Sequence, residues 1–367
     1  MNNAPIQVTK TYLPQLEEYT ALLEQVWDRH WVTNGGPLVL ELEATLSKRL
    51  DVPLQLVSNG TVALQLAIHA LELTGSVITT PFSYVATTNV LLWENLHPVF
   101  VDVEPTWYTL DPGLVEAAIT PDTSAILATH VYGYPCQHAQ LEAIARRHGL
   151  ALIYDAAHAF DVRVDGHSVL QWGDVSTLSF HATKVFHTIE GGGVLTDDPE
   201  LLERLDLLRT FGHVGRDHRS LGINGKNTEF HAAIGLLNLP RLAPNRVARK
   251  TISDRYRSLL SDLPLTALDP ADYPGLEYNY AYFPVFCPDA DCRELLIEAL
   301  NAEEIYPRRY FEPSLNELNF LSGEPRASCP VSEHASRTVV CLPLYPDLAL
   351  DDVDRICAII HQSLVAV

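Results

Sequence analysis

Apolar and polar residues repeat with different periods in different parts of this chain. Near the N-terminus, apolar residues recur every three to four positions over residues 14–30 and again over residues 37–50, the second segment beginning with Pro37. This spacing is typical of amphipathic helices that bury one face. The sequence therefore predicts two helices before the main body of the fold.

From about residue 55, short apolar runs rich in β-branched residues alternate with helical segments. Such runs are typical of strands that are buried on both faces of a mostly parallel sheet. The glycine-rich run that begins at residue 192 is a possible antiparallel exception. The runs are residues 54–60, 76–81, 97–103, 124–133, 150–159, 174–180 and 192–198.

The C-terminal part has a different order of elements. A helix is predicted over 199–210, followed by a long helix from 226 to about 262 that Pro240 and Pro244 interrupt. From about residue 275 the order becomes strand, helix, strand, helix, over residues 279–286, 291–303, 338–345 and 351–364. We therefore predict an α/β fold with helices on both faces of a mostly parallel central sheet. It comprises a large domain of residues 1–245 and a small α+β domain of residues 246–367.

Composition excludes several classes of function. The formal net charge of −21 argues against a nucleic-acid partner, because such binding depends on clustered Lys and Arg. No apolar run approaches the roughly 20 residues of a membrane span, and the N-terminus lacks the apolar core of a signal peptide. We expect a cytoplasmic protein without membrane contact. The six cysteines form no C-x-x-C pair, which predicts free buried thiols and no zinc site.

Polar residues stand where several predicted strands end, which is where open α/β sheets bind ligands. Ser58-Asn59-Gly60-Thr61 separates the first strand from an apolar helix. The free N–H groups and the helix dipole at such a turn suit a phosphate group. An ordinary helix cap by Ser58, Asn59 or Thr61 is the alternative interpretation.

Asp155 ends a strongly apolar run, so its carboxylate needs a cationic or hydrogen-bonding partner, or it caps the next helix. His158 follows three residues later. A metal site built from Asp155, His158 and Asp161 is conceivable, but helical spacing places Asp161 nearly two turns from Asp155. We predict no metal.

Lys184 is one of only five lysines, and it follows Ser179, His181 and Thr183 directly after an apolar run. It could be a solvated surface residue, but the small polar residues around it fit a pocket better. A lysine that is partly desolvated has a lowered pKa and acts as a nucleophilic amine. The reaction that uses such an amine is Schiff-base formation with a carbonyl.

The turn at residues 58–61, Asp155 and Lys184 together match one ligand, pyridoxal 5′-phosphate (PLP). PLP carries a phosphate, an aldehyde that reacts with lysine, and a ring nitrogen that pairs with a carboxylate. No single feature is specific, but the set is. A dinucleotide-binding oxidoreductase is disfavoured, because no G-x-G-x-x-G follows a strand.

Over nearly its whole length the sequence resembles the sugar aminotransferases of the DegT/DnrJ/EryC1/StrS group, which have the PLP fold-type-I architecture of aspartate aminotransferase. VTKTYLPQLEEY, WVTNGGP and YPRRYFEPSLN are most similar to the branch acting at C4, whose members aminate dTDP-4-keto-6-deoxy-D-glucose. The resemblance implies deoxyamino sugar biosynthesis, with lipopolysaccharide O-antigen as its setting. The matching motifs lie at residues 58–67, 79–93, 98–105, 130–135, 154–161, 179–198 and 224–236.

The resemblance implies a role for each site residue. Lys184 forms the Schiff base with the cofactor and shuttles the proton, Asp155 pairs with the ring nitrogen, and His158 approaches the phenolate oxygen. Tyr84 stacks on the ring. The remaining contacts are to the phosphate, from Gly60, Thr61 and Ser179, and from Asn224 of the partner subunit. A homodimer with its sites at the subunit interface is therefore the expected active unit.

Three positions differ from the family pattern. His187 stands where asparagine is usual, Asn227 where methionine is common, and Lys226 where arginine is frequent. Because an ammonium group cannot make the bidentate contact of a guanidinium, Lys226 alters any phosphate contact there. A related dehydratase carries histidine in place of the lysine, so Lys184 argues against that activity.

We predict a ping-pong aminotransferase that moves an amino group from L-glutamate to a nucleotide-linked keto-sugar. His181, Lys226, Arg308 and Arg309 are the candidate substrate-binding residues, the two arginines for the diphosphate. A charge pair at the edge of a strand is the alternative role for these arginines. Other candidate reactions are amination at C3 of a dTDP-sugar or at C4 of a GDP- or UDP-sugar. A non-catalytic PLP-binding regulator is a more remote alternative.

Overall fold

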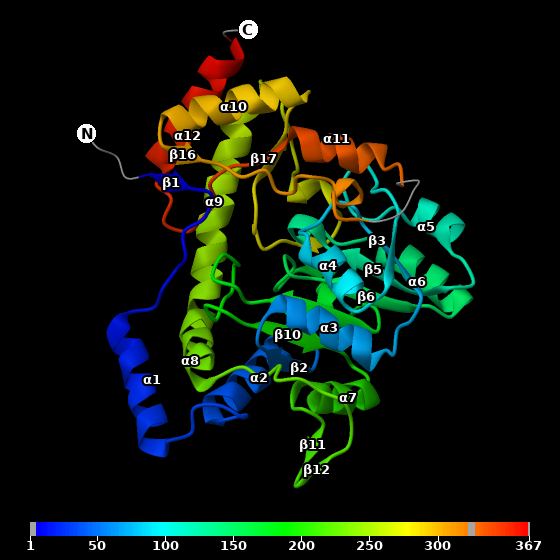
Figure 1. The fold of residues 1–367 in the computed structure, drawn as a ribbon. Coiled ribbons are helices and arrows are strands. Elements are labelled where there is room, and N and C mark those ends of the chain that lie inside the picture. Colours follow the sequence, from blue (N-terminus) through cyan, green and yellow to red (C-terminus); the bar gives the residue numbers. More distant parts are fainter. Residues whose placement is uncertain (1–4, 322–326, 366–367) are drawn as a thin grey trace.

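A seven-stranded sheet forms the centre of the molecule in the computed structural model, which describes residues 5–321 and 327–365 (Figure 1). Neighbouring strands are parallel except for β10, which is antiparallel to both β2 and β9. The predicted sheet and its antiparallel exception are both confirmed. In spatial order the strands are β2 (Leu54–Val57), β10 (Gly192–Leu195), β9 (Val175–Ser179), β6 (Ala151–Asp155), β5 (Thr123–Thr129), β3 (Ser76–Thr79) and β4 (His97–Phe100).

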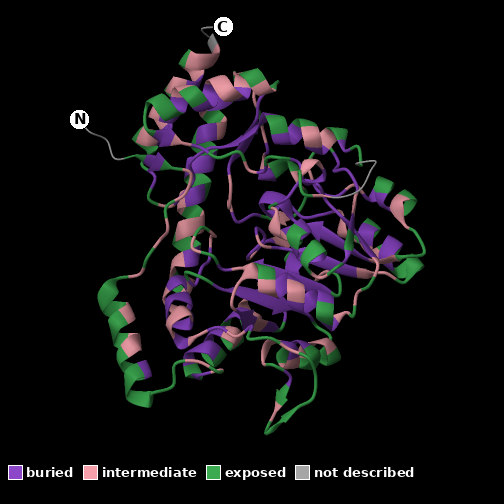
Figure 2. Ribbon diagram, viewed as in Figure 1, coloured by how far each residue is buried: buried purple, intermediate pink, exposed green. Residues whose placement is uncertain are grey.

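Helices cover both faces of this sheet, and successive residues of a strand face opposite layers. On β6, Ile153 packs in the cluster formed with α3, α4 and α7, whereas Leu152 and Tyr154 pack on the side of α5 and α6. Figure 2 shows the sheet as almost entirely buried. This double coverage explains why the strands read as continuous apolar runs. The helices are α3 (Gly60–Ala70), α4 (Ala86–Trp93), α5 (Pro112–Ala118), α6 (His138–His148) and α7 (Pro199–Arg209).

The two N-terminal helices, α1 (Leu16–Arg29) and α2 (Pro37–Leu50), are buried to very different extents. Five residues of α2 are buried, but in α1 only Val26 is. The carboxylate of Glu229 caps α2 by accepting hydrogen bonds from the N–H groups at positions 38 and 39, at 3.1 and 2.9 Å. Figure 1 shows α1 standing apart from the sheet. Only part of its predicted apolar face is exposed in the single chain: Leu16 and Trp27 are exposed, whereas Tyr19 and Leu22 pack against the core.

The long helix predicted from residue 226 is divided as the prolines indicated. It consists of α8 (Glu229–Asn238), a 3₁₀ turn (Leu239–Arg241) that contains Pro240, and α9 (Leu242–Leu260). Pro244 lies in the first turn of α9, where a missing N–H breaks no helical hydrogen bond. Pro240 therefore marks the division, and α9 continues through Pro244.

A second hydrophobic core lies around α9, α10 (Ala290–Ala302) and α12 (Leu350–Val365). It includes the antiparallel sheet of β13 (Thr266–Ala267), β15 (Pro284–Phe286) and β17 (Val339–Cys341). The N-terminal strand β1 (Ile6–Gln7) pairs with β16 (Ile305–Tyr306), and Ile6 belongs to this core. The first residues thus pack with the C-terminal part, whereas the division of the chain at residue 245 stays a prediction.

The strand predicted over 279–286 is shorter than expected. Only β15, from Pro284 to Phe286, is a strand, because Tyr280 has a φ of 54° and interrupts the extended backbone. Among the described residues no helix is long and apolar enough to cross a membrane. The remaining elements are β7 (Arg163–Val164), β8 (His167–Ser168), β14 (Leu276–Glu277), α11 (Pro330–Thr338) and the hairpin of β11 (His213–Val214) and β12 (Asp217–His218).

Candidate active site

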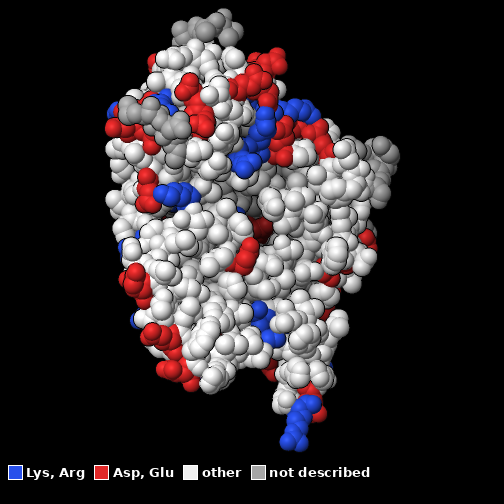
Figure 3. Space-filling model, turned by 60° about the vertical axis from the view of Figure 1, so that its left-hand side comes forward, with Lys and Arg blue, Asp and Glu red and all other residues white. Residues whose placement is uncertain are grey.

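A cavity of about 710 Å³ lies at the ends of β2, β6 and β9 and is closed on its other side by residues 282, 310 and 311. Figure 3 shows the molecule hollowed on one face, with basic side chains above the hollow. The strand ends meet here as predicted for an open α/β sheet. Of the residues singled out in the sequence, the cavity brings together Gly60, Thr61, Tyr84, Asp155, His158, Ser179, His181 and Lys184.

The turn before α3 forms one end of the cavity. Asn59 caps the helix, its side chain accepting a hydrogen bond from the N–H of Val62 at 2.9 Å. A Cβ placed on Gly60 would lie 2.9 Å from the Cβ of Ser179, so only glycine fits against that strand. Among the described residues, the N–H groups of Gly60 and Thr61 donate to no protein acceptor. The turn is therefore capped and still leaves two N–H groups free, as an anion site requires.

Asp155 is the last residue of β6, and its carboxylate is buried. Its two oxygens accept hydrogen bonds from Thr87 Oγ1 at 2.8 Å and from the N–H of Ala157 at 3.1 Å. Burial raises the pKa of Asp155, and the hydrogen bond from Thr87, the bond from Ala157 and the nearby Lys184 ammonium oppose this increase. A cationic group in the cavity would stabilise the carboxylate further.

Lys184 extends into the cavity from the loop after β9, with Nζ 3.4 Å from the hydroxyl of Tyr282. Part of the side chain faces the cavity, but the amine lies deep. Desolvation lowers the pKa of Lys184 to about 8, although Asp155 and Tyr84 act in the opposite direction. About a tenth of this amine is thus unprotonated at pH 7, far more than for an ordinary lysine, and the unprotonated form is the nucleophile.

His158 presents a hydrogen-bond donor to the same cavity. Its Nδ1 accepts from the N–H of Tyr132 at 3.2 Å, so in the neutral ring the hydrogen is on Nε2. Burial, with a smaller contribution from Lys184, holds the pKa of His158 well below its usual value, which keeps the ring neutral. The ring stacks on Phe311 with centroids 5.4 Å apart. His158 is therefore a fixed neutral donor.

His181 lies at the exposed rim of the cavity. Its Nδ1 is 2.8 Å from Thr183 Oγ1, and its Nε2 is 3.7 Å from the carboxylate of Glu190. Both Glu190 and Thr183 also line the cavity. This rim group can meet a ligand that enters from solvent, and its backbone carbonyl accepts a hydrogen bond from the N–H of Lys184 at 2.9 Å.

The metal site considered from the sequence is not assembled. Asp161 pairs with Arg49 at 2.6 Å, so its carboxylate serves an ion pair. Across residues 5–321 and 327–365, no group of three or more His, Cys, Asp or Glu side chains is arranged to hold a metal ion.

Comparisons with known proteins now add to this geometry. A profile of the DegT/DnrJ/EryC1/StrS aminotransferase family matches residues 15–361. The chain belongs to this family. It is 39% identical over 365 residues to the dTDP-4-amino-4,6-dideoxy-D-glucose transaminase of Shigella dysenteriae, covering 98% of this chain and 99% of that protein.

Two further proteins that are similar to this chain are named for different sugar nucleotides. The UDP-N-acetyl-3-dehydro-alpha-D-glucosamine 3-aminotransferase of Acidithiobacillus ferrooxidans is 33% identical over 312 residues, covering 84% of this chain and 83% of that protein. The crystal structure of DesI in the presence of its TDP-sugar product superposes with a TM-score of 0.93 at 36% identity, covering 98% of this chain and 93% of DesI. The predicted fold-type-I architecture is confirmed.

PLP is the cofactor of these aminotransferases, and the cavity has the groups it needs. The free N–H groups of Gly60 and Thr61 suit the phosphate, the Lys184 amine suits the aldehyde, and the Asp155 carboxylate suits the ring nitrogen. A side chain at position 60 would collide with Ser179, which lines the same end of the cavity. The residues present therefore fit PLP.

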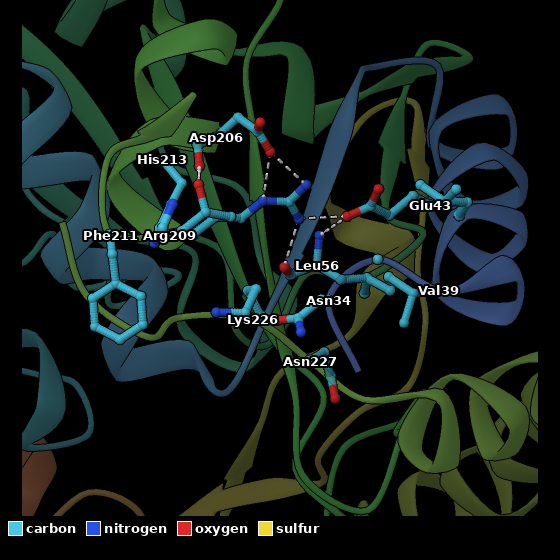
Figure 4. Close-up of a pocket in the computed structure, with 13 residues that line it drawn as sticks. Asn34, Val39, Glu43, Leu56, Asp206, Arg209, Phe211, His213, Lys226 and Asn227 are labelled. Atoms are coloured by element: carbon cyan, nitrogen blue, oxygen red, sulfur yellow. Dashed lines mark hydrogen bonds and ion pairs between the residues drawn. The ribbon is translucent and has the colours of Figure 1, made fainter. Parts of the chain in front are cut away.

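Lys226 lines a different cavity, of about 580 Å³, which Figure 4 shows. Asn224 lies beside Lys226. Lys226 Nζ donates to Asn224 Oδ1 at 2.8 Å and lies 5.0 Å from the centroid of the Phe211 ring. Neither residue lines the cavity of Lys184 in the same chain. Their predicted contacts to the cofactor and substrate would have to be made across a subunit boundary.

Arg309 and Arg308 have different surroundings. The guanidinium of Arg309 pairs with Glu294 and, at 3.4 Å, with Glu312. Arg308 is exposed and makes no ion pair with the described residues, although it lies close enough to Tyr310 to oppose the burial-driven rise in the pKa of that phenol. Since Tyr310 lines the cavity, Arg308 is the better placed of the two for a substrate contact.

The positions that depart from the family pattern have structural partners. His187 Nε2 lies 2.6 Å from the carbonyl oxygen of Tyr12. This contact connects the N-terminal segment to the loop that follows Lys184. Asn227 is buried and donates to the carbonyl of Val57 at 3.3 Å. Both side chains hold backbone near the cavity without lining it.

Several residues in and beside the cavity were not found from the sequence. Thr87 lies on α4 and bonds Asp155, while Tyr282, Tyr310 and Phe311 come from the C-terminal part. Tyr282 lies in a segment predicted as an ordinary strand, 98 positions from the lysine that it bonds. The only available signal was the density of tyrosines around residue 280.

Proposed function

We propose that this aminotransferase moves an amino group from L-glutamate to C4 of dTDP-4-keto-6-deoxy-D-glucose, giving dTDP-4-amino-4,6-dideoxy-D-glucose. The observation that carries the reaction class is the desolvated Lys184 amine, which shares one cavity with a buried carboxylate and a free helix N-terminus. The choice of sugar is supported by the 39% identity to a transaminase named for that product, over nearly the full length of both chains.

Lys184 is the residue that handles protons in this scheme. When bound, PLP supplies an aldehyde that carries the amino group and a ring that accepts electrons. The pKa of about 8 allows Lys184 Nζ to take up and return a proton near neutral pH. Tyr282, 3.4 Å away, gives the free amine a fixed hydrogen-bond partner. Lys184 therefore serves as nucleophile and as acid–base group.

The other cavity residues bind and orient. In this scheme Asp155 would pair with a protonated ring nitrogen and His158 Nε2–H would donate to an anionic phenol oxygen, since both side chains line the cavity of Lys184. Tyr84 is 58% exposed, so its ring is free to cover a ligand from the solvent side. Gly60, Thr61 and Ser179 would hold the phosphate.

We further propose a homodimer, because one chain leaves the site short of positive charge. The basic side chains that line the cavity are Lys184, His158 and His181, with no arginine among the described residues. The cofactor phosphate, the glutamate carboxylates and a sugar diphosphate are all anionic. Asn224 and Lys226 of a second chain would supply part of the missing contacts.

Exposed apolar side chains support this second subunit. They gather on α1, on and before α2, and in the segment around residues 211–223, all at the lower end of the molecule in Figure 1. Exposed apolar side chains in such number at one end of a molecule suit an interaction site. The residues and their exposed fractions are Leu16 71%, Trp27 61%, Trp31 47%, Val32 42%, Leu40 55%, Phe211 45%, Leu221 77% and Ile223 41%.

Amination at C3 of a sugar nucleotide is the second candidate function. It is favoured by the 33% identity to a 3-aminotransferase, which covers 84% of this chain. The cofactor site does not distinguish C3 from C4, because its residues contact PLP and not the sugar. A non-catalytic regulator is disfavoured, because the amine, the carboxylate and the phosphate cradle are all present.

The test is a direct assay of product formation. Purified PLP-loaded protein is incubated with L-glutamate and one sugar nucleotide per reaction. The sugar nucleotides are dTDP-4-keto-6-deoxy-D-glucose, a dTDP-3-keto-sugar, a GDP-linked 4-keto-sugar and a UDP-linked 4-keto-sugar. The products are identified by mass spectrometry and NMR. We expect kcat/KM to be highest for the dTDP-4-keto-sugar and 2-oxoglutarate to appear in equal amount. Preference for a 3-keto-sugar would overturn the choice of C4. Absence of amino transfer with every acceptor would overturn the enzyme assignment.

A further inference from the structure

Three buried hydroxyl side chains form a continuous line that ends on the carboxylate of Asp155. Thr129 Oγ1 lies 3.2 Å from Ser83 Oγ, Ser83 Oγ lies 2.8 Å from Thr87 Oγ1, and Thr87 Oγ1 lies 2.8 Å from Asp155 Oδ2. The three hydroxyl residues are at most 1% exposed. They come from the end of β5, the loop after β3 and the first turn of α4.

The direction of every hydrogen bond in this line follows from the carboxylate. An ionised carboxylate only accepts, so Thr87 has to use its one hydroxyl hydrogen on Asp155. Ser83 must then donate to Thr87, and Thr129 must donate to Ser83. All three donors therefore point toward Asp155. Hydrogen bonds aligned in this way polarise and strengthen one another.

We propose that Thr87, Ser83 and Thr129 are positioning residues that keep Asp155 ionised and correctly oriented for the ring nitrogen of PLP. This inference rests on the proposed pairing of Asp155 with that nitrogen. A carboxylate that stays ionised keeps the ring nitrogen protonated, and the ring then withdraws electrons during amino transfer. The three hydroxyl groups act through Asp155 and do not contact the reacting atoms themselves.

The surroundings of Asp155 show why such support is needed. The carboxylate is buried, which favours its neutral form. Thr87 bonds one oxygen and the N–H of Ala157 bonds the other, which fixes the plane of the group. The ionisable groups that share its cavity include Lys184, His158 and the phenols of Tyr84 and Tyr282. Of the hydrogen bonds and charges that oppose desolvation, the bond from Thr87 is the strongest.

The chain contains a matched control at the next position. Thr88 is also on α4 and is fully buried, but among the described residues its hydroxyl has no hydrogen-bond partner. Thr88→Val therefore removes a buried hydroxyl from the same helix without touching the line to Asp155. Any general effect of exchanging threonine for valine on this helix should appear equally in both variants.

The experiment measures the protonation of PLP labelled with ¹⁵N at the ring nitrogen, by NMR over a pH range, in the intact PLP-loaded protein. In wild type we expect a protonated nitrogen. In Thr87→Val we expect its pKa to fall by about one unit, a tenfold loss of proton affinity. Thr88→Val should match wild type, and Thr87→Ser, which keeps the hydroxyl, should restore the wild-type value. Ser83→Ala should shift the pKa in the same direction by less.

Two outcomes separate failure of this inference from failure of the proposed site. If Asp155→Asn deprotonates the ring nitrogen but Thr87→Val and Ser83→Ala behave like Thr88→Val, the hydroxyl line has no such role and the site stands. If Asp155→Asn leaves the nitrogen protonated, the pairing on which the inference rests is wrong. If Thr87→Val fails to fold, as judged by circular dichroism, Ser83→Ala decides the question. A lowered pKa of the ring nitrogen in that variant supports the inference, and an unchanged pKa overturns it.

Discussion

Two cavities of this molecule each hold a lysine, in opposite surroundings. Lys184 lies among buried polar groups whose hydrogen bonds are fixed within the chain, and desolvation lowers its pKa to about 8. Lys226 lies beside Asn224 and above the half-exposed ring of Phe211, and within residues 5–321 and 327–365 it pairs with no acidic side chain. The first lysine is prepared for chemistry by its own chain, whereas the second is a charge without a counterpart there.

The arginine in the second cavity sharpens this difference. Figure 4 shows Arg209 held between Glu43 and Asp206, at 2.5 and 2.8 Å, so its charge is neutralised within the chain. Lys226 is then the available cation of that cavity. The comparison suggests a division of labour, in which each chain provides a complete reactive amine and lends a cation to its partner.

The largest effect on activity should come from replacing each of the two lysines by alanine in separate variants. Lys184→Ala removes the nucleophile and the proton carrier, so we expect kcat for amino transfer to fall by at least roughly 10³-fold. Lys226→Ala should leave a reactive Lys184 and weaken binding of PLP or substrate instead. Steady-state kinetics and the PLP content of both variants provide the measurement. Equal losses of kcat in the two variants would contradict the division.

A disrupted subunit contact should have the next largest effect. In Trp27→Asp a charge replaces an apolar side chain that is 61% exposed on α1, and burying that charge in an interface is unfavourable. We expect a monomer by analytical ultracentrifugation, with activity reduced by about tenfold or more as the dimer is lost. Trp93, 79% exposed on α4, provides the matched control. A dimer that persists in Trp27→Asp, or dissociates in Trp93→Asp, would place the interface elsewhere.

Much of the main site could be predicted because it depends on strand ends. The apolar runs locate the strands, and parallel strands bring Gly60, Asp155 and Ser179 to the same edge of the sheet. Thr87 was missed because it bonds Asp155 across 68 positions, a contact set by how α4 packs on the sheet. The period of hydrophobic residues shows which face of an element is apolar, but not what covers that face.

The same limit explains the N-terminal region. The spacing over residues 14–30 correctly predicts helix α1, yet Leu16 and Trp27 on its apolar face are exposed in the single chain. The pairing of Ile6 with Ile305 joins the N-terminal strand to the C-terminal part of the chain, and no local pattern encodes so distant a partner. Tyr282 and its bond to Lys184 belong to the same class of contact.

A moderate effect is expected from pH. The Lys184 amine reacts only when unprotonated, so the rate at which cofactor-free protein captures PLP should rise about tenfold per pH unit below pH 8 and level off above it. Asp155→Asn should move the midpoint to lower pH, because the Asp155 carboxylate raises the pKa of Lys184. Stopped-flow absorbance measures the rate. A midpoint near the ordinary lysine value of 10.5 would contradict the desolvated amine.

The smallest effect concerns the arginines near the rim. Arg308→Ala should raise KM for the sugar nucleotide by roughly three- to tenfold with little change in kcat, as expected for one exposed charge contact. Arg309→Ala should leave KM unchanged, because that guanidinium already pairs with Glu294 and Glu312. The reverse pattern would show that the ion pairs open on binding. Unchanged KM in both variants would remove the arginines from the substrate site.

The central claim is that the Lys184 cavity transfers an amino group by way of PLP. The most direct measurement is the visible absorption spectrum of the PLP-loaded protein before and after addition of L-glutamate, and then of dTDP-4-keto-6-deoxy-D-glucose. We predict a yellow band that L-glutamate bleaches and the keto-sugar restores, and that is absent in Lys184→Ala. A band in wild type that is indifferent to L-glutamate and to every other amino donor would contradict the account.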